Sequence, residues 1–269
     1  MWDFERGERA RELAKQFEIT YTVPSLCADA LRVGEADIGI IPAITYQTIP
    51  DLVVIPDIAI AAVGAVRSIL LVSRTAISEV RKVAVDTSSR TSVALLQILF
   101  RKGWINGGKN IPEFIPQSPE LEPMLASCDA ALLIGDPALA IDRTQYHVVD
   151  LAEVWSARTG RPFVFAFWAV RKKALIETDA VKLSKIFQRS RDNGLANVNA
   201  IAKEWAARIG IAEAHVISYL TSSISYSLPP ETISGLNLFF DLAAELKLIP
   251  VAHPLEFIST DASVSSLSG

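Results

Sequence analysis

Hydroxyl side chains gather where an apolar strand pattern, Lys82–Val85, gives way to a helical one. Ser89, Arg90, Thr91 and Ser92 stand at this change. Free backbone N–H groups at the start of a helix, with hydroxyls beside them, bind carboxylate or phosphate groups. The segment therefore predicts an anion site in which the hydroxyls are ligands and the arginine can pair with the anion. An ordinary capped helix with a surface arginine is the equally weighted alternative.

A second strand-to-helix change lies in the sequence Leu-Leu-Ile-Gly-Asp at 132–136. Gly135 allows close backbone approach to a ligand, and Asp136 stands as an N-cap before Pro137. On pattern alone a plain capped helix is favoured. If this strand end faces the same ligand as the segment at 89–92, both residues have a role in binding.

Some single residues are further candidates for the same site. One serine begins a strand expected at 68–73, and another opens the first long helix. A proline and a threonine follow the strand expected at 36–41, where they would form a wall of the site. Two phenylalanines of a later strand can pack a ligand ring or belong to the core. These candidates are Ser68, Ser25, Pro42, Thr45, Phe163 and Phe165.

Other chemistries lack their residue patterns. His147, His215 and His253 are scattered, and no Cys, His or carboxylate spacing is typical of a metal site. No glycine-rich dinucleotide fingerprint, phosphate loop or nucleophile elbow is present. We therefore expect a site without metal or cofactor.

The composition excludes several classes of protein. Of 269 residues, 26 are basic and 30 are acidic, so the net charge of −4 argues against a nucleic-acid-binding protein. Half the residues are hydrophobic, but no apolar run is long enough to cross a membrane. Cys27 and Cys128 read as core residues, and the charged start lacks a secretion signal. We expect a cytoplasmic protein and leave a homodimer open.

Apolar runs alternate with helical patterns, which indicates an α/β protein with parallel strands joined by crossover helices. Helices are expected at 26–33 and 92–101 and again through most of the chain after 170. The expected strands are 18–23, 36–41, 52–55, 58–63, 68–73, 82–85, 113–115, 130–134, 147–151 and 163–170.

This order suggests two lobes, the second inserted in the first. Residues 1–66 and 165–260 would form the first lobe and residues 67–164 the second, with hinges at 64–67 and 160–162. Residues 261–269, rich in serine, read as a flexible tail. Two-lobed folds bind small ligands in the cleft between lobes, where helix N-termini converge.

Three motifs resemble the chorismate dehydratase family, which acts in the futalosine route of menaquinone biosynthesis. They are Ser-Arg-Thr-Ser at 89–92, Leu-Leu-Ile-Gly-Asp at 132–136 and Arg-Thr-Gly-Arg-Pro-Phe-Val-Phe-Ala-Phe-Trp at 158–168. The resemblance runs in matching order from about residue 2 to residue 248. It implies a type 2 periplasmic-binding-protein-like fold that serves as a cytoplasmic lyase.

The resemblance also implies a substrate and a reaction. Chorismate, a dicarboxylate, would lose its C3 proton and C4 hydroxyl to give 3-[(1-carboxyvinyl)oxy]benzoate and water. In the family the substrate's own enolpyruvyl carboxylate takes the proton, while a serine at the position of Ser68 and an asparagine near the N-terminus hold the geometry. Because the ring becomes aromatic, the enzyme has to orient the substrate and place charge, without redox work.

The start of the sequence departs from the family pattern. Relatives carry a strand and an Asn-containing turn before the tryptophan that matches Trp2, and this sequence contains neither. In the family that strand lies between the strands expected here at 19–23 and 37–41. We therefore expect the native gene product to begin upstream, and the activity of a chain that lacks this strand and turn stays open.

Two other functions stay open at this point. The same fold serves exported proteins that bind small organic anions without catalysis. A sister lyase of the same pathway shares the fold but acts on a futalosine-derived nucleoside. The motifs at 89–92 and 158–163 fit the dehydratase better than this sister enzyme.

Overall fold

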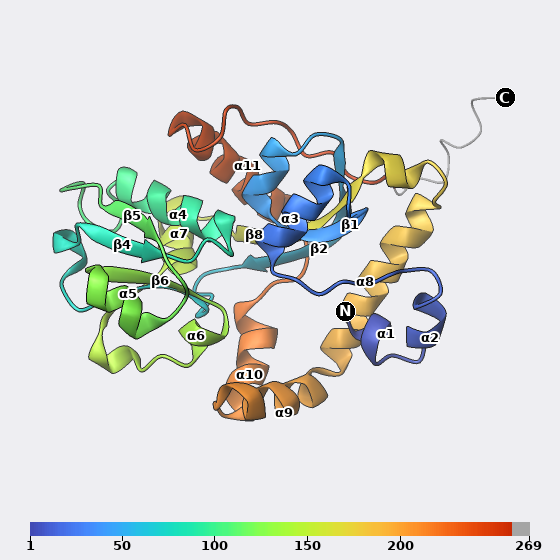
Figure 1. Ribbon diagram of the computed structural model, residues 1–269, viewed down its shortest axis with the longest axis horizontal. Helices are drawn as coiled ribbons and strands as arrows, with labels where there is room; N and C mark the ends of the chain where they lie inside the picture. Colours follow the sequence, from blue (N-terminus) through green and yellow to red (C-terminus); the bar gives the residue numbers. More distant parts are fainter. Residues whose placement is uncertain (260–269) are drawn as a thin grey trace.

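Two β-sheets, each covered by its own helices, organise the chain (Figure 1). The computed structural model describes residues 1–259. The first sheet has three strands in the order β1-β8-β2, and the second has five in the order β5-β4-β6-β3-β7. Figure 1 shows the second sheet and its helices at the left and the first sheet at the upper right.

The first sheet is built around β8, which is apolar at nearly every position. Such a strand must be covered on both faces. Antiparallel to it run β1 on one side and β2 on the other. The strands are β1 (Ile38–Pro42), β2 (Leu52–Ala62) and β8 (Phe163–Arg171), and α3 (Pro24–Val33), α8 (Ala180–Ala196) and α11 (Pro230–Glu245) pack on them.

The second sheet is mixed. One side of it is parallel, because β4 runs beside β5 and β6 in the same direction, whereas β3 runs antiparallel to β6 and β7. The strands are β3 (Ile69–Ser73), β4 (Lys82–Val85), β5 (Glu113–Pro116), β6 (Ala130–Ile134) and β7 (His147–Asp150). Its helices are α4 (Arg90–Arg101), α5 (Leu121–Ser127), α6 (Asp136–Leu139) and α7 (Leu151–Thr159).

The other helices belong to the periphery of the first sheet. Two short helices at the start of the chain lie near α8, and α9 and α10 form an arm below the two sheets in Figure 1. No described helix has the length and apolar content that crossing a membrane needs. The helices are α1 (Trp2–Glu5), α2 (Ala10–Leu13), α9 (Val198–Ile209) and α10 (Glu213–Ser218). The short turns are η1 (Ala43–Thr48), η2 (Ile77–Glu79), η3 (Arg143–Gln145), η4 (Lys172–Leu175) and the π-helical η5 (Tyr219–Ser223).

The predicted two-lobed α/β fold is confirmed, but the expected parallel strand order is wrong. Among the strands β1–β8 of the described residues, only the pairs that β4 makes are parallel. The physical reason lies in the chain path: β8 returns from the second lobe and inserts between β1 and β2 in the opposite direction. The division of the lobes at 66/67 and 164/165 stays a prediction, and the expected tail at 261–269 lies outside the described residues.

The strand expected at 18–23 is also wrong. This segment forms no strand in the structure, and none of its backbone N–H groups donates to another described backbone carbonyl. An alternating pattern yields a strand only when a partner edge completes the ladder. The runs at 52–55 and 58–63 were expected as separate strands. They form one strand, β2, with an irregular register between Val54 and Ala59.

The first crossing between the sheets is held by a buried carboxylate. Asp150, 5% exposed, accepts hydrogen bonds from the backbone N–H groups of Val66 (3.2 Å) and Arg67 (2.6 Å). The same side chain caps α7 by accepting from Ala152 and Glu153. Arg67 has φ +67°, a conformation that costs a non-glycine residue free energy and persists only when neighbouring contacts enforce it.

The second crossing is tied to the first through one hydroxyl. Ser156 Oγ accepts from the backbone N–H of Gly64 at 3.0 Å and donates to the carbonyl of Arg161 at 3.2 Å. Gly64 and Gly160 both adopt positive φ, so each crossing turns where glycine is favoured. The two chain passages between the sheets are therefore joined.

We predict that Asp150→Ala lowers the free energy of unfolding by about 2–4 kcal/mol, because four backbone donors lose a charged acceptor. Urea denaturation at pH 7 measures the change. Asp179→Ala is the matched control, since Asp179 caps α8 from an exposed position with a single bond to Lys182. The control should lose clearly less stability, and equal losses would contradict the role of Asp150 at the crossing.

Candidate active site

Three segments singled out by the sequence meet at one edge of the second sheet. The strands β4 and β6 are parallel and both end there, while β3 runs the other way and begins there. The N-terminus of α4, the turn 135–136 and Ser68 are therefore neighbours. This edge also carries the first crossing, so it faces the first lobe.

Ser68 is anchored in this edge by its backbone and its hydroxyl. It is 3% exposed, and its carbonyl accepts the backbone N–H of Gly135 at 2.7 Å. Its Oγ accepts the phenolic hydrogen of Tyr219, which lies 2.9 Å away on η5. Ser68 thus lies between the end of β6 and the helical arm of the first lobe.

The turn after β6 differs from the expected cap. Gly135, with φ +70°, is the N-cap of α6, and Asp136 is the first helical residue, so the prediction of Asp136 as N-cap is wrong. The reason is conformational, because a turn at this positive φ suits glycine and not a residue with a side chain. Asp136 is exposed, and its charge contributes to raising the pKa of Tyr219.

The hydroxyls at the start of α4 are mostly occupied by protein partners. Thr91 and Ser92 are fully buried. Thr91 Oγ1 accepts the backbone N–H of Ile44 in the first lobe at 3.2 Å, and Ser92 Oγ lies 2.9 Å from Ser89 Oγ. Ser89 is the N-cap residue and makes no side-chain capping bond. Ser89 is half-buried, and Ser92 is the one partner of its hydroxyl among the described residues.

Arg90 joins the two lobes through an ion pair. Its guanidinium donates to both carboxylate oxygens of Asp29 on α3, at 3.1 and 2.6 Å. The hydrogen bonds from Arg90 are the largest cause that lowers the pKa of Asp29, and Arg32 adds to the effect. The structure therefore places Arg90 against a carboxylate of the protein itself.

The first-lobe candidates Ser25, Pro42 and Thr45 are all buried. Thr45 Oγ1 donates to the carbonyl of Pro42 at 2.6 Å, which closes the turn after β1. Thr45 also lines a cavity of about 270 Å³ at the lobe boundary together with Thr87 and Arg90. The structure thus puts Thr45 and Arg90 on one cavity, which Ser68 does not line.

Phe163 and Phe165 lie in the core. They are 0% and 5% exposed, and their ring centroids are 4.7 Å apart. Phe163 also packs edge-on against Trp155 and Phe239. Of the two roles left open by the sequence, the structure gives these rings the packing role.

Tyr219 and Tyr226 are the residues that sequence reasoning missed. Burial is the largest cause that raises the pKa of each phenol. The contact between Tyr219 and Ser68 joins residues 151 positions apart. No local pattern signals such a pair, because only the fold brings its members together.

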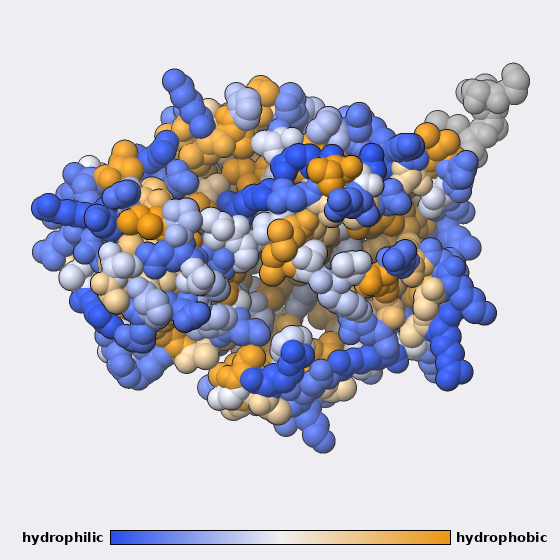
Figure 2. Space-filling view, in the orientation of Figure 1, coloured by the Kyte–Doolittle hydropathy of each residue, from blue (hydrophilic) through white to orange (hydrophobic). Residues whose placement is uncertain are grey.

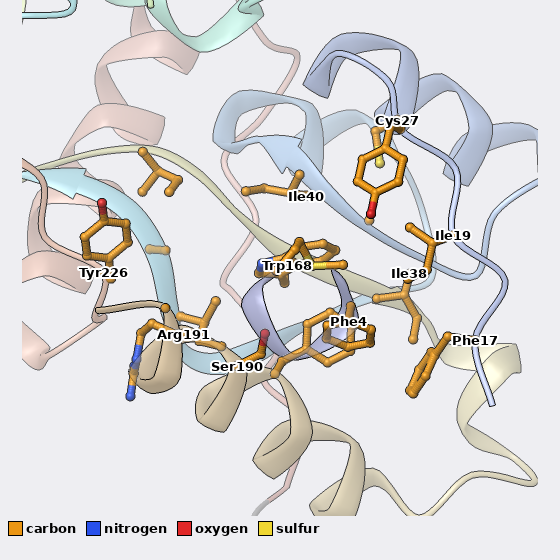
Figure 3. A pocket seen from close by; sticks show the side chains of 18 of the residues that line it. Phe4, Phe17, Ile19, Cys27, Ile38, Ile40, Trp168, Ser190, Arg191 and Tyr226 are labelled. Atoms are coloured by element: carbon orange, nitrogen blue, oxygen red, sulfur yellow. The ribbon is translucent and has the colours of Figure 1, made fainter. Parts of the chain in front are cut away.

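A larger, apolar cavity of about 410 Å³ lies in the first lobe. The extended segment 18–22 and β1 both line it, and Figure 3 shows Tyr226 at the end opposite Phe17. Figure 2, in the orientation of Figure 1, shows a hollow in the middle of the molecule. The residues that line the cavity and are labelled in Figure 3 are Phe4, Phe17, Ile19, Cys27, Ile38, Ile40, Trp168, Ser190, Arg191 and Tyr226. None of the predicted site residues lines this cavity.

The fold defines the class of protein first. A solved protein of Archaeoglobus fulgidus matches with a TM-score of 0.64 at 16% identity, covering 89% of this chain and 92% of that one. The periplasmic aliphatic sulphonate-binding protein of Escherichia coli matches with a TM-score of 0.60 at 16% identity, covering 90% and 88%. The chain has the two-lobed fold of periplasmic solute-binding proteins.

The family follows from two sequence comparisons. A family model described as menaquinone biosynthesis matches residues 2–245. A chorismate dehydratase of Thermus thermophilus is 29% identical over 261 residues, covering 88% of this chain and 90% of that protein. The chain belongs to the menaquinone biosynthesis family, and the resemblance drawn from its motifs is confirmed.

We predict that Asp29→Asn lowers the free energy of unfolding at pH 7 by less than about 1 kcal/mol, because the Arg90–Asp29 pair is exposed to solvent and screened. The pKa of Asp29 is lowered in the folded state, so the pair stabilises above its unfolded pKa, near 4. The difference between wild type and variant should therefore shrink as the pH falls below about 4.

Urea denaturation between pH 3 and pH 7 measures this difference. Asp241→Asn serves as control, since Asp241 is exposed and makes no ion pair within residues 1–259. A gap between wild type and Asp29→Asn that stays constant down to pH 3 would show that the ion pair does not operate.

Proposed function

We propose that the protein eliminates water from chorismate to give 3-[(1-carboxyvinyl)oxy]benzoate. The observation that carries this proposal is the meeting of Ser68, the N-terminus of α4 and the 135–136 turn at one sheet edge. The chain belongs to the menaquinone biosynthesis family and is similar to a chorismate dehydratase, so this edge is a candidate binding site for chorismate. As a biosynthetic enzyme, the protein would act in the cytoplasm.

The substrate carries two carboxylates that need donors. The free N–H groups at the start of α4 and the hydroxyl of Ser89 supply neutral donors for one of them. A helix N-terminus attracts an anion without bringing a positive side chain close to the reacting ring. Gly135 lets the ring approach the backbone on the other wall, and Asp136 borders it.

The reaction needs orientation more than acid–base power. The C3–H bond breaks, its electron pair forms the new ring double bond, and the C4–O bond breaks so that the hydroxyl leaves and forms water with the proton taken from C3. The substrate's own enolpyruvyl carboxylate takes the C3 proton, as the family resemblance implies. Ser68 holds the substrate by a hydrogen bond so that this carboxylate reaches C3.

The purified gene product, mixed with chorismate, should form the aromatic ether at a rate proportional to enzyme concentration. Absorbance and mass spectrometry follow the product. Binding of chorismate without turnover would favour an anion-binding protein of the same fold. Turnover of a futalosine-derived nucleoside in place of chorismate would favour the sister lyase. Either result would overturn the proposal.

We predict that Ser68→Ala and Ser89→Ala have different kinetic effects. Ser68→Ala should lower kcat by about 10- to 100-fold with little change in KM, because it removes an orienting bond at the reacting ring. Ser89→Ala should raise KM by about tenfold with kcat nearly kept, because its hydroxyl serves uniform carboxylate binding. Steady-state kinetics with chorismate measures both, and equal effects on KM alone would contradict these roles.

A further inference from the structure

Tyr219 occupies an unusual place in the chain. It begins η5, a π-helical turn that follows α10 directly. Such turns are rare and occur frequently at functional sites. In the structure this turn carries the phenol to the sheet edge of the other lobe, where it lies 2.9 Å from Ser68 Oγ.

The segment that carries Tyr219 is fixed to the chain that carries Ser68. Ser225 and Ala61 exchange both backbone hydrogen bonds, at 2.8 and 2.9 Å, as an antiparallel bridge. The backbone N–H of Ala59 donates to the carbonyl of Tyr226 at 3.2 Å. These backbone bonds between β2 and the segment after η5 therefore help to hold Tyr219 beside Ser68.

In the hydrogen bond between Tyr219 and Ser68, the tyrosine is the donor and the serine is the acceptor. Within residues 1–259, Tyr219 is the only hydrogen-bond partner of Ser68 Oγ. A serine hydroxyl has one hydrogen to donate and lone pairs to accept. Because the phenol donates to the serine oxygen, the serine hydrogen stays free for a third group. A hydroxyl that accepts one hydrogen bond also becomes a better donor in the next.

The surroundings keep the phenol in its donating form. Burial and the charge of Asp136 both raise the pKa of Tyr219, which outweighs the opposite effect of the Ser68 bond. Tyr226, the neighbouring phenol, has its own pKa raised by burial and by Tyr219. The phenol of Tyr219 thus gives the edge a donor without a charge.

We propose that Tyr219 is a positioning residue that orients the Ser68 hydroxyl toward the bound substrate. Its phenol donates to Ser68 Oγ and thereby directs the serine hydrogen to the substrate oxygen that Ser68 holds. This inference rests on the proposed function, since it deepens the role of Ser68 in that reaction. Tyr219 itself touches the serine and acts through it.

Tyr219→Phe removes the phenolic oxygen and keeps the ring, so it tests the proposal without opening a cavity. The variant should lower kcat for chorismate about tenfold, as the loss of one hydrogen bond allows, and leave KM within about twofold. In a Ser68→Ala background the same change should lower kcat by less than about twofold more, because the group it orients is gone.

The control is Tyr146→Phe, which removes a phenol that bonds the exposed Glu122 at 3.3 Å in the second lobe. It should leave kcat and KM unchanged. An unchanged kcat in Tyr219→Phe would overturn the proposal. So would a full tenfold loss in the Ser68→Ala background, or a loss expressed in KM alone.

A second measurement separates this inference from the proposed function. Tyrosine labelled with ¹³C at Cζ gives one signal for each of the five tyrosines, and Tyr219→Phe assigns the signal of Tyr219. Ser68→Ala should shift that signal and leave the signal of Tyr146 in place. If wild type makes no product, the proposed function fails, and the signal alone decides: an unmoved Tyr219 signal overturns the pair.

Discussion

One buried carboxylate sets the geometry on which the candidate site depends. Asp150 binds the backbone of Val66 and Arg67 while it caps α7, so it fixes where the chain enters the second sheet. Ser68 is the next residue, and its position relative to β6 follows from that entry. The left-handed φ of Arg67 belongs to the same constraint, because a free chain avoids this conformation. The site serine is thus placed by a contact that involves no site residue.

The sequence alone predicts those parts of the site whose signal is local. The strand β4 and the helix α4 were expected within two residues of their observed bounds, because an apolar run, a polar turn and a helical period follow one another. The same holds for β6 and the turn at Gly135, where a glycine interrupts an apolar run. The ends of these strands meet because adjacent parallel strands share an edge.

What the sequence does not predict depends on distant partners. The segment 18–23 alternates as a strand should, yet its backbone has no ladder partner within residues 1–259, and most of it lines a cavity. The direction of β8 is set by its return from the second lobe, which hydrophobic periodicity does not encode. The local sequence around Arg90 predicts an anion ligand, but in the structure Arg90 pairs with the carboxylate of Asp29 on α3.

The contact between Tyr219 and Ser68 shows what the first lobe adds to the candidate site in the second. Within its own lobe, Ser68 is held through its backbone by Gly135, and no described residue of that lobe bonds its hydroxyl. The helical arm of the first lobe supplies that partner across the crossing, and the bridge at Ala61 and Ser225 keeps the arm in register. The proposed elimination, driven by aromatisation, requires mainly that its groups stay where they are, and a donor fixed from the opposite lobe would meet that requirement.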